Sequence, residues 1–101
     1  MFDMTNLKRI GAFGQRAPSA MAGFKALDQH ALADGAIPKK YKELMAIAVA
    51  LTTQCLYCIE VHRKAAISAG ATEDDLAETV FVAAALRAGA AVTHGTHLFA
   101  D

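Results

Sequence analysis

Residues 43–62 read ELMAIAVALTTQCLYCIEVH, and this stretch organises the rest of the chain. It holds the only two cysteines of the 101-residue sequence, Cys55 and Cys58, which are separated by two residues. Glu43 precedes Cys55 by twelve residues, and His62 follows Cys58 by four. Two thiols, an imidazole and a carboxylate are groups that thiol redox chemistry and proton transfer use. Cys58, Cys55, His62 and Glu43 are therefore the candidate catalytic residues.

The spacing of apolar residues predicts helices throughout the chain. Residues 18–33 and 38–51 carry apolar side chains at intervals of three and four, and a further helix is expected over about residues 73–88. The helix over 38–51 is apolar nearly all round, so we expect it to lie centrally and to end at a break over residues 52–54. Residues 1–16 show a similar spacing that two glycines interrupt, so we expect a short helix or a loose arm there. No segment alternates apolar and polar residues over a useful length. The predicted fold class is all-α, with about five to six helices in a single domain over residues 1–101.

Capping signals set the expected helix ends beyond the cysteine pair. One helix is expected to begin near Cys55 and to end at Gly70, which suits a C-terminal cap. Thr72, with Asp75 three residues later, is a variant of the capping box that begins a helix. Gly89 is expected to end or bend that helix, ahead of a last short one. The cysteine pair is thus predicted at the N-terminus of a central helix.

Glu43 and His62 are expected to meet across an antiparallel helix pair that turns at residues 53–54. At roughly 1.5 Å per residue, Glu43 lies about 15 Å before the turn and His62 about 12 Å after it. A carboxylate beside an imidazole fixes the tautomer of the ring and supports it as a base. Glu43 also interrupts an otherwise apolar stripe, and a buried carboxylate needs a partner.

Thiol chemistry requires that one cysteine be held as the thiolate. The helix N-terminus favours negative charge, and His62 lies one turn after Cys58 on the same helix face. One thiolate then attacks the O–O bond of a hydroperoxide and becomes a sulfenic acid, and the second cysteine condenses with it. An external dithiol reductant protein opens the disulfide by exchange, without a bound cofactor. The residues alone leave the order of attack open, because Cys55 is nearer the helix terminus.

The bulk composition limits the partners and the compartment. Lys plus Arg equals Asp plus Glu at ten each, which argues against nucleic-acid binding. The first residues have no signal-peptide core, and the apolar runs at 44–51 and 80–86 look too short to span a membrane. The expected location is therefore cytoplasmic, where paired cysteines indicate catalysis or metal binding. Because 54% of this short chain is hydrophobic, a homo-oligomer is expected.

The pattern Glu43, Cys55-x-x-Cys58 and His62 resembles the alkylhydroperoxidase AhpD-like branch of the carboxymuconolactone decarboxylase family. The resemblance runs from about residue 35 to the C-terminus, and the four residues with their spacings are specific to it. It implies an AhpD-like helical bundle that assembles as a trimer or hexamer. It also implies an antioxidant peroxidase, with peroxiredoxin activity on organic hydroperoxides, or a disulfide oxidoreductase.

The resemblance assigns roles to the four residues. It implies that Cys58 attacks the peroxide, that Cys55 resolves the intermediate, and that His62 and Glu43 relay the proton through water. Decarboxylase members generally lack the cysteine pair, so its presence favours the redox branch. One departure is Tyr57, because some peroxidase members have a histidine just before the second cysteine.

Two other functions are compatible with the sequence. The first is a non-catalytic zinc-binding or assembly domain. Its ligands would be Cys55, Cys58 and His62 with one of Glu43, His94 and His97. The second is a cofactor-free, decarboxylase-type acid–base enzyme that uses only His62 and Glu43. For Glu43, a further alternative is a surface carboxylate paired with Lys39 or Lys40.

Overall fold

The computed structural model describes residues 2–99 and 101, and these residues form five α-helices, two 3-10 helices and no strand. The elements are η1 (Met4–Arg9), α1 (Ile10–Arg16), α2 (Pro18–Leu32), α3 (Lys39–Thr53), α4 (Leu56–Ser68), α5 (Glu73–His94) and η2 (Gly95–Phe99). The prediction of an all-α fold with about five to six helices is confirmed.

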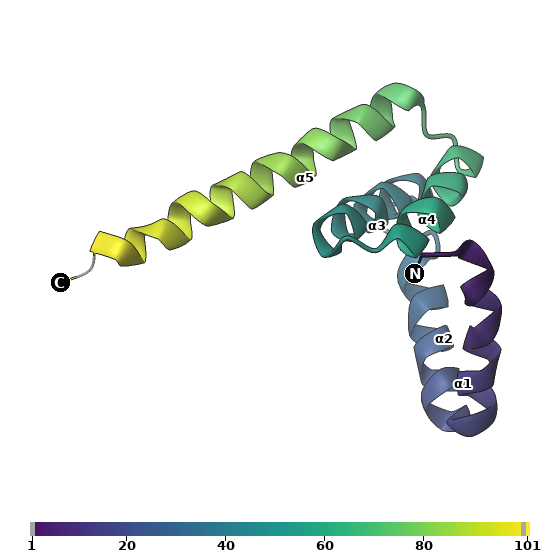
Figure 1. The fold of residues 1–101 in the computed structure, drawn as a ribbon. Coiled ribbons are helices and arrows are strands. Elements are labelled where there is room, and N and C mark those ends of the chain that lie inside the picture. The colour runs from purple at the N-terminus through teal and green to yellow at the C-terminus, as the bar shows by residue number, and fades with distance from the viewer. Residues whose placement is uncertain (1, 100) are drawn as a thin grey trace.

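The helices form two hairpins and one long projecting helix (Figure 1). The first hairpin pairs α1 with α2, and the second pairs α3 with α4. Helix α5 packs against α3 near its start, and its far end stands clear of the other helices. Helix α3 contacts α2, α4 and α5, so the prediction of a central position for it is confirmed.

The turn between α3 and α4 places the cysteine pair. Gln54 adopts a left-handed conformation with φ 58°, which ends α3 and reverses the chain. The predicted break is shorter than expected, since α3 remains helical through Thr53. Cys55 is the extended N-cap residue of α4, and its sulfur accepts a hydrogen bond from the backbone N–H of Cys58 at 3.3 Å. The pair therefore stands at a helix N-terminus, as predicted, and this helix packs against α3.

The signals between α4 and α5 act as expected, but the end of α5 does not. Gly70 has φ 99°, a conformation that favours glycine, and it follows the last turn of α4. Thr72 and Asp75 form a reciprocal capping box at the start of α5. The prediction that Gly89 ends or bends this helix is wrong, because α5 runs on to His94. The alanines on both sides of Gly89 favour helix strongly enough to offset a cost of about 1 kcal/mol.

Removing the capping hydroxyl by Thr72→Ala is expected to lower the free energy of unfolding by about 1 kcal/mol. The hydroxyl accepts from the backbone N–H of Asp75 at 3.1 Å, and that donor has no intrahelical partner. Urea denaturation followed by circular dichroism measures the change. Thr93→Ala is the control, because this exposed threonine lies inside the same helix and only donates to backbone carbonyls. Equal losses in the two variants would contradict the capping role.

The buried core of the described chain is small and consists mostly of short side chains. The buried apolar residues are Ile47, Ala50, Ala66 and Ala83. Two polar residues, Glu43 and Thr79, are buried with them, and Glu43 has only 2% of its surface exposed. Large apolar side chains on α1, α2 and α5 remain exposed, so much of the hydrophobic content lies at the surface.

Helix α5 and η2 form one continuous helical stretch of 27 residues, Glu73–Phe99. Its most apolar window has a mean hydropathy of 1.4 and is 6% buried, so by length and composition alone it is able to cross a membrane. By this measure, the expectation that no apolar segment is long enough to span a membrane is wrong. The expectation considered only uninterrupted apolar runs, whereas this helix also contains polar residues. A single such helix is weak support for a membrane span. Arg87 lies within the stretch, and Thr79 and Ala83 are buried in the fold.

Candidate active site

The α3–α4 hairpin brings Glu43 and His62 into direct contact. Glu43 Oε2 lies 2.6 Å from His62 Nδ1, and Glu43 Oε1 lies 3.0 Å from the Nζ of Lys39. The contact predicted from helix arithmetic is therefore present. The alternative pairing with Lys39 is present too, but Glu43 is buried and not a surface carboxylate. Among the described residues, no buried side-chain nitrogen or oxygen lacks a hydrogen-bond partner.

The surroundings of Glu43 keep it ionised. Burial raises the pKa of the Glu43 carboxyl, but the hydrogen bonds from His62 and Lys39 together outweigh burial. The net pKa is lowered from the ordinary value of 4.5, so Glu43 is a carboxylate at neutral pH.

This contact determines which nitrogen of His62 is free for chemistry. A carboxylate at Nδ1 accepts the proton of that nitrogen, so neutral His62 carries its proton on Nδ1. The Nε2 lone pair is then left to take a proton from another group. The side chain of His62 is 18% exposed, so the ring is reachable but largely enclosed.

The pKa values of the two thiols are shifted in opposite directions. The hydrogen bonds from the Cys58 thiol and the Cys58 backbone N–H lower the pKa of Cys55. The same thiol–thiol hydrogen bond, followed by burial and the Cys55 charge, raises the pKa of Cys58 to about 11. In the reduced protein, Cys55 is thus the sulfur that holds negative charge more readily, and Cys58 keeps the shared proton.

The two cysteine residues line different cavities. Cys58 and His62 share a cavity of about 320 Å³ between α2, α3 and α4, whose other walls are mostly small and apolar. Asp28 of α2 stands in the same cavity. Cys55 lines a separate, open hollow of about 410 Å³ together with Tyr57 and residues near it. Cys55 and Glu43 do not line the cavity that Cys58 and His62 share, although Cys55 is hydrogen-bonded to Cys58 and Glu43 to His62.

Tyr57 lies on the Cys55 side and is held by the N-terminal segment. Its ring packs against Phe2 with centroids 4.9 Å apart, and its hydroxyl accepts a hydrogen bond from Asn6 Nδ2 at 3.0 Å. The backbone N–H of Asp3 donates to the same hydroxyl at 3.4 Å. Sequence reasoning missed these contacts, since no pattern links residues more than fifty positions apart.

The histidines considered as zinc ligands lie elsewhere. His94 ends α5 and His97 lies in η2, with ring centroids 5.6 Å apart. The C-terminal end of α5 stands clear of the other helices (Figure 1). Within residues 2–99 and 101, no three His, Cys, Asp or Glu side chains cluster in a way that suits a metal ion. The geometry of the donors therefore gives no support to the zinc alternative.

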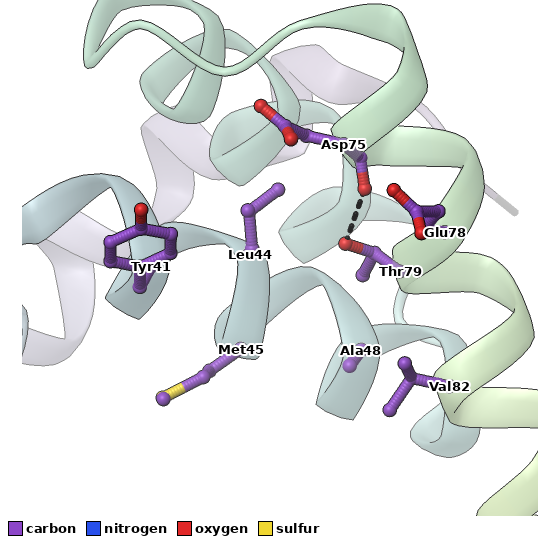
Figure 2. A pocket seen from close by; sticks show the side chains of 8 residues that line it. All are labelled: Tyr41, Leu44, Met45, Ala48, Asp75, Glu78, Thr79 and Val82. Atoms are coloured by element: carbon purple, nitrogen blue, oxygen red, sulfur yellow. Dashed lines mark hydrogen bonds between the residues drawn. The ribbon is translucent and has the colours of Figure 1, made fainter.

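A further hollow, of about 360 Å³, lies on the opposite side of α3, between α3 and α5 (Figure 2). Its lining residues are Tyr41, Leu44, Met45, Ala48, Asp75, Glu78, Thr79 and Val82. The Thr79 hydroxyl donates to the backbone carbonyl of Asp75 at 2.8 Å. No thiol or imidazole lines this hollow, so it is separate from the candidate site.

The fold and the site define a small helical protein with a dithiol beside a carboxylate–imidazole pair. The profile of the carboxymuconolactone decarboxylase family matches residues 18–101, and the chain belongs to this family. The family resemblance inferred from the cysteine pattern is confirmed at this level.

The chain is also similar to a curated relative and to two solved structures, one of which is named as a member of this family. The chain is 41% identical to "Uncharacterized protein 4 in cox locus" of Paracoccus denitrificans, over 99% of this chain and 93% of that protein. It resembles the structure of a carboxymuconolactone decarboxylase family protein from Legionella pneumophila, with 38% identity, a TM-score of 0.74 and coverage of 79% and 71%. A protein from Methanobacterium thermoautotrophicum matches with 30% identity, a TM-score of 0.77 and coverage of 85% and 99%.

Proposed function

We propose that this protein is a thiol-dependent peroxidase or disulfide oxidoreductase of the AhpD-like branch, which reduces organic hydroperoxides through Cys55 and Cys58. One observation carries the proposal: Cys58 and His62 line the same cavity, and Glu43 holds the Nδ1 of His62 at 2.6 Å. A thiol with a raised pKa needs a base beside it, and an oriented imidazole is that base.

In the first step, Cys58 attacks the hydroperoxide. His62 Nε2 takes the thiol proton, the sulfur bonds to the terminal peroxide oxygen, and the O–O bond breaks. The alkoxide leaving group takes a proton and departs as the alcohol, and Cys58 becomes a sulfenic acid. Glu43 stabilises the transient imidazolium, because its carboxylate stays ionised against the other side of the ring.

In the second step, Cys55 resolves the sulfenic acid. The lowered pKa of Cys55 suits this role, since a thiolate attacks the Cys58 sulfur and releases hydroxide, which is protonated to water. Cys55 at the N-cap and Cys58 in the first turn of α4 are near enough for a disulfide. An external dithiol reductant protein then reduces this disulfide by two exchange steps and leaves oxidised itself.

The proposal extends to the assembly and the compartment. The exposed apolar side chains of α5, such as Leu86 at 67% and Val92 at 74%, favour burial against further copies of the chain in a trimer or hexamer. The open, largely apolar hollow between α3 and α5 is a second surface for such contacts (Figure 2). A cytoplasmic location fits the cycle, because reducing conditions there regenerate the dithiol.

A second function is favoured by one specific observation. The Glu43–His62 pair is itself an oriented base that does not depend on sulfur. A decarboxylase-type acid–base enzyme that uses this pair alone is therefore the alternative, and Cys58→Ser would leave such an activity intact.

Exposure of the reduced wild type to one equivalent of tert-butyl hydroperoxide tests the proposal. We expect both thiols to disappear from a thiol titration and the chain to become lighter by two hydrogen atoms, as one internal disulfide forms. Intact mass spectrometry and recovery of both thiols with a dithiol measure this. Thiols that stay masked with one bound zinc per chain, or thiols inert to peroxide, would contradict it.

A further inference from the structure

Lys39 connects the candidate site to the end of α2. Its Nζ lies 3.0 Å from Glu43 Oε1 and donates to the backbone carbonyl of Leu32 at 3.2 Å. Lys39 opens α3 one turn before Glu43, and the carboxylate of Asp34 accepts from its backbone N–H at 2.7 Å. Glu43 is thus held between two nitrogens, with one carboxylate oxygen bonded to Lys39 and the other to His62.

We propose that Lys39 is a positioning residue that fixes the Glu43 carboxylate and sets the pH at which His62 is free to accept a proton. The inference rests on the proposed role of His62 as the base of the thiol cycle. Lys39 is not part of the pattern formed by Glu43, the two cysteines and His62. In the sequence, only its position four residues before Glu43 indicates that the two side chains can pair.

Lys39 acts on the Glu43–His62 pair through its charge at short range. A bare carboxylate against an imidazole strongly favours the protonated ring, and a ring that is already protonated accepts no proton from a thiol. The ammonium of Lys39 on the other oxygen offsets part of that attraction. It also prevents the carboxylate from rotating, because each of its two oxygens is bonded to a different side chain.

The other ionisable groups around the pair come from three elements. They are Asp28 of α2, Asp34 of the α2–α3 connection, and Cys58 of α4. These two carboxyl groups and this thiol are neutral when protonated and negative when deprotonated. None of them can therefore replace the positive charge of Lys39. Partial exposure of the Lys39 side chain, at 44%, lets solvent weaken its effect but not remove it.

The chain provides a matched control for Lys39. Lys42 lies on the same turn of α3, and its Nζ donates at 2.6 Å to the carbonyl of Ala33, the residue after Leu32. It does not share the hydrogen bonds of Glu43. Lys42→Met therefore removes a similar anchor to the end of α2 and leaves the carboxylate untouched, whereas Lys39→Met removes both. Lys39→Arg restores the charge.

The test follows the ring nitrogens of His62 by ¹⁵N NMR across a pH titration of the reduced protein, with His62→Gln used to assign the signals. Lys39→Met is expected to raise the titration midpoint of the ring by about one pH unit. Lys39→Arg should return the midpoint toward the wild-type value, and Lys42→Met should leave it in place. The acid limb of the peroxide oxidation rate should move up with the midpoint.

The two hypotheses fail in distinguishable ways. An unmoved midpoint in folded Lys39→Met overturns the inference, even if the variant is less stable. An equal shift in Lys42→Met overturns it as well, because a loosened α2 would then suffice. If the wild type does not react with peroxide but the midpoint moves, the proposed function fails and the effect of Lys39 on the ring stands.

Discussion

Replacing Cys58 with serine is expected to slow the oxidation of the reduced protein by organic hydroperoxide about a hundredfold or more. A serine hydroxyl is not oxidised by peroxide, so only Cys55 remains to react. Cys55 lines a different cavity from His62 and lacks the help of that base. The oxidation rate is therefore expected to fall because the variant loses both the attacking sulfur and its general base.

The matching variant, Cys55→Ser, is expected to give the opposite pattern. Cys58 should still react, and the reaction should stop at the sulfenic acid, because the resolving thiolate is missing. Stopped-flow mixing with tert-butyl hydroperoxide measures the rates, and dimedone labelling with mass spectrometry detects the sulfenic acid. The hydrogen bond to the Cys55 thiol is the largest cause of the raised pKa of Cys58, so removing that thiol should lower the pKa. The oxidation rate of this variant is therefore expected to reach its plateau at a lower pH than that of the wild type.

The structure makes this pair of variants a real test of the order of attack. The lowered pKa of Cys55 is the argument for Cys55 as the first nucleophile, and the shared cavity with His62 is the argument for Cys58. Rapid oxidation of Cys58→Ser with an inert Cys55→Ser would reverse the two roles. Full activity of both variants in a reaction without peroxide would favour the acid–base alternative instead.

Sequence reasoning succeeded where local rules fix geometry. The rise of a helix and the position of one turn were enough to predict that Glu43 meets His62. The same holds for the capping box at Thr72 and the left-handed position of Gly70, which follow from backbone hydrogen bonding alone.

Other features depend on contacts that a linear pattern does not encode. That Cys58 and Cys55 line different cavities depends on how α2 lies against the α3–α4 hairpin. The sequence presents His62 and Lys39 as alternative partners of Glu43, but the carboxylate has an oxygen for each and binds both. Helix α5 continues past Gly89, where the sequence predicts an end or a bend. The helix propensity of the flanking residues is greater than the cost of one glycine.

Removing the buried carboxylate is expected to have the largest effect on stability. Glu43→Ala should lower the free energy of unfolding by about 3 kcal/mol at pH 7, near the low end for breaking a buried pair. The low end applies because Lys39 is partly exposed and water solvates it once Glu43 is gone. Glu43→Gln keeps the shape and one acceptor oxygen, so a smaller loss is expected. Urea denaturation at a fixed protein concentration measures both, since self-association would otherwise alter the result.

The pH dependence separates the charge of Glu43 from its size. The pKa of this carboxyl is lowered in the folded protein, so its contribution is fully present above about 4.5 and is lost as the pH falls through the folded value. The difference in stability between wild type and Glu43→Gln should therefore shrink on acidification below pH 4.5. Glu60→Gln, which changes a carboxylate at the surface of α4, should change stability little in the same pH range. A difference that persists unchanged into acid would mean that packing, and not the ion pairs with His62 and Lys39, keeps Glu43 in place.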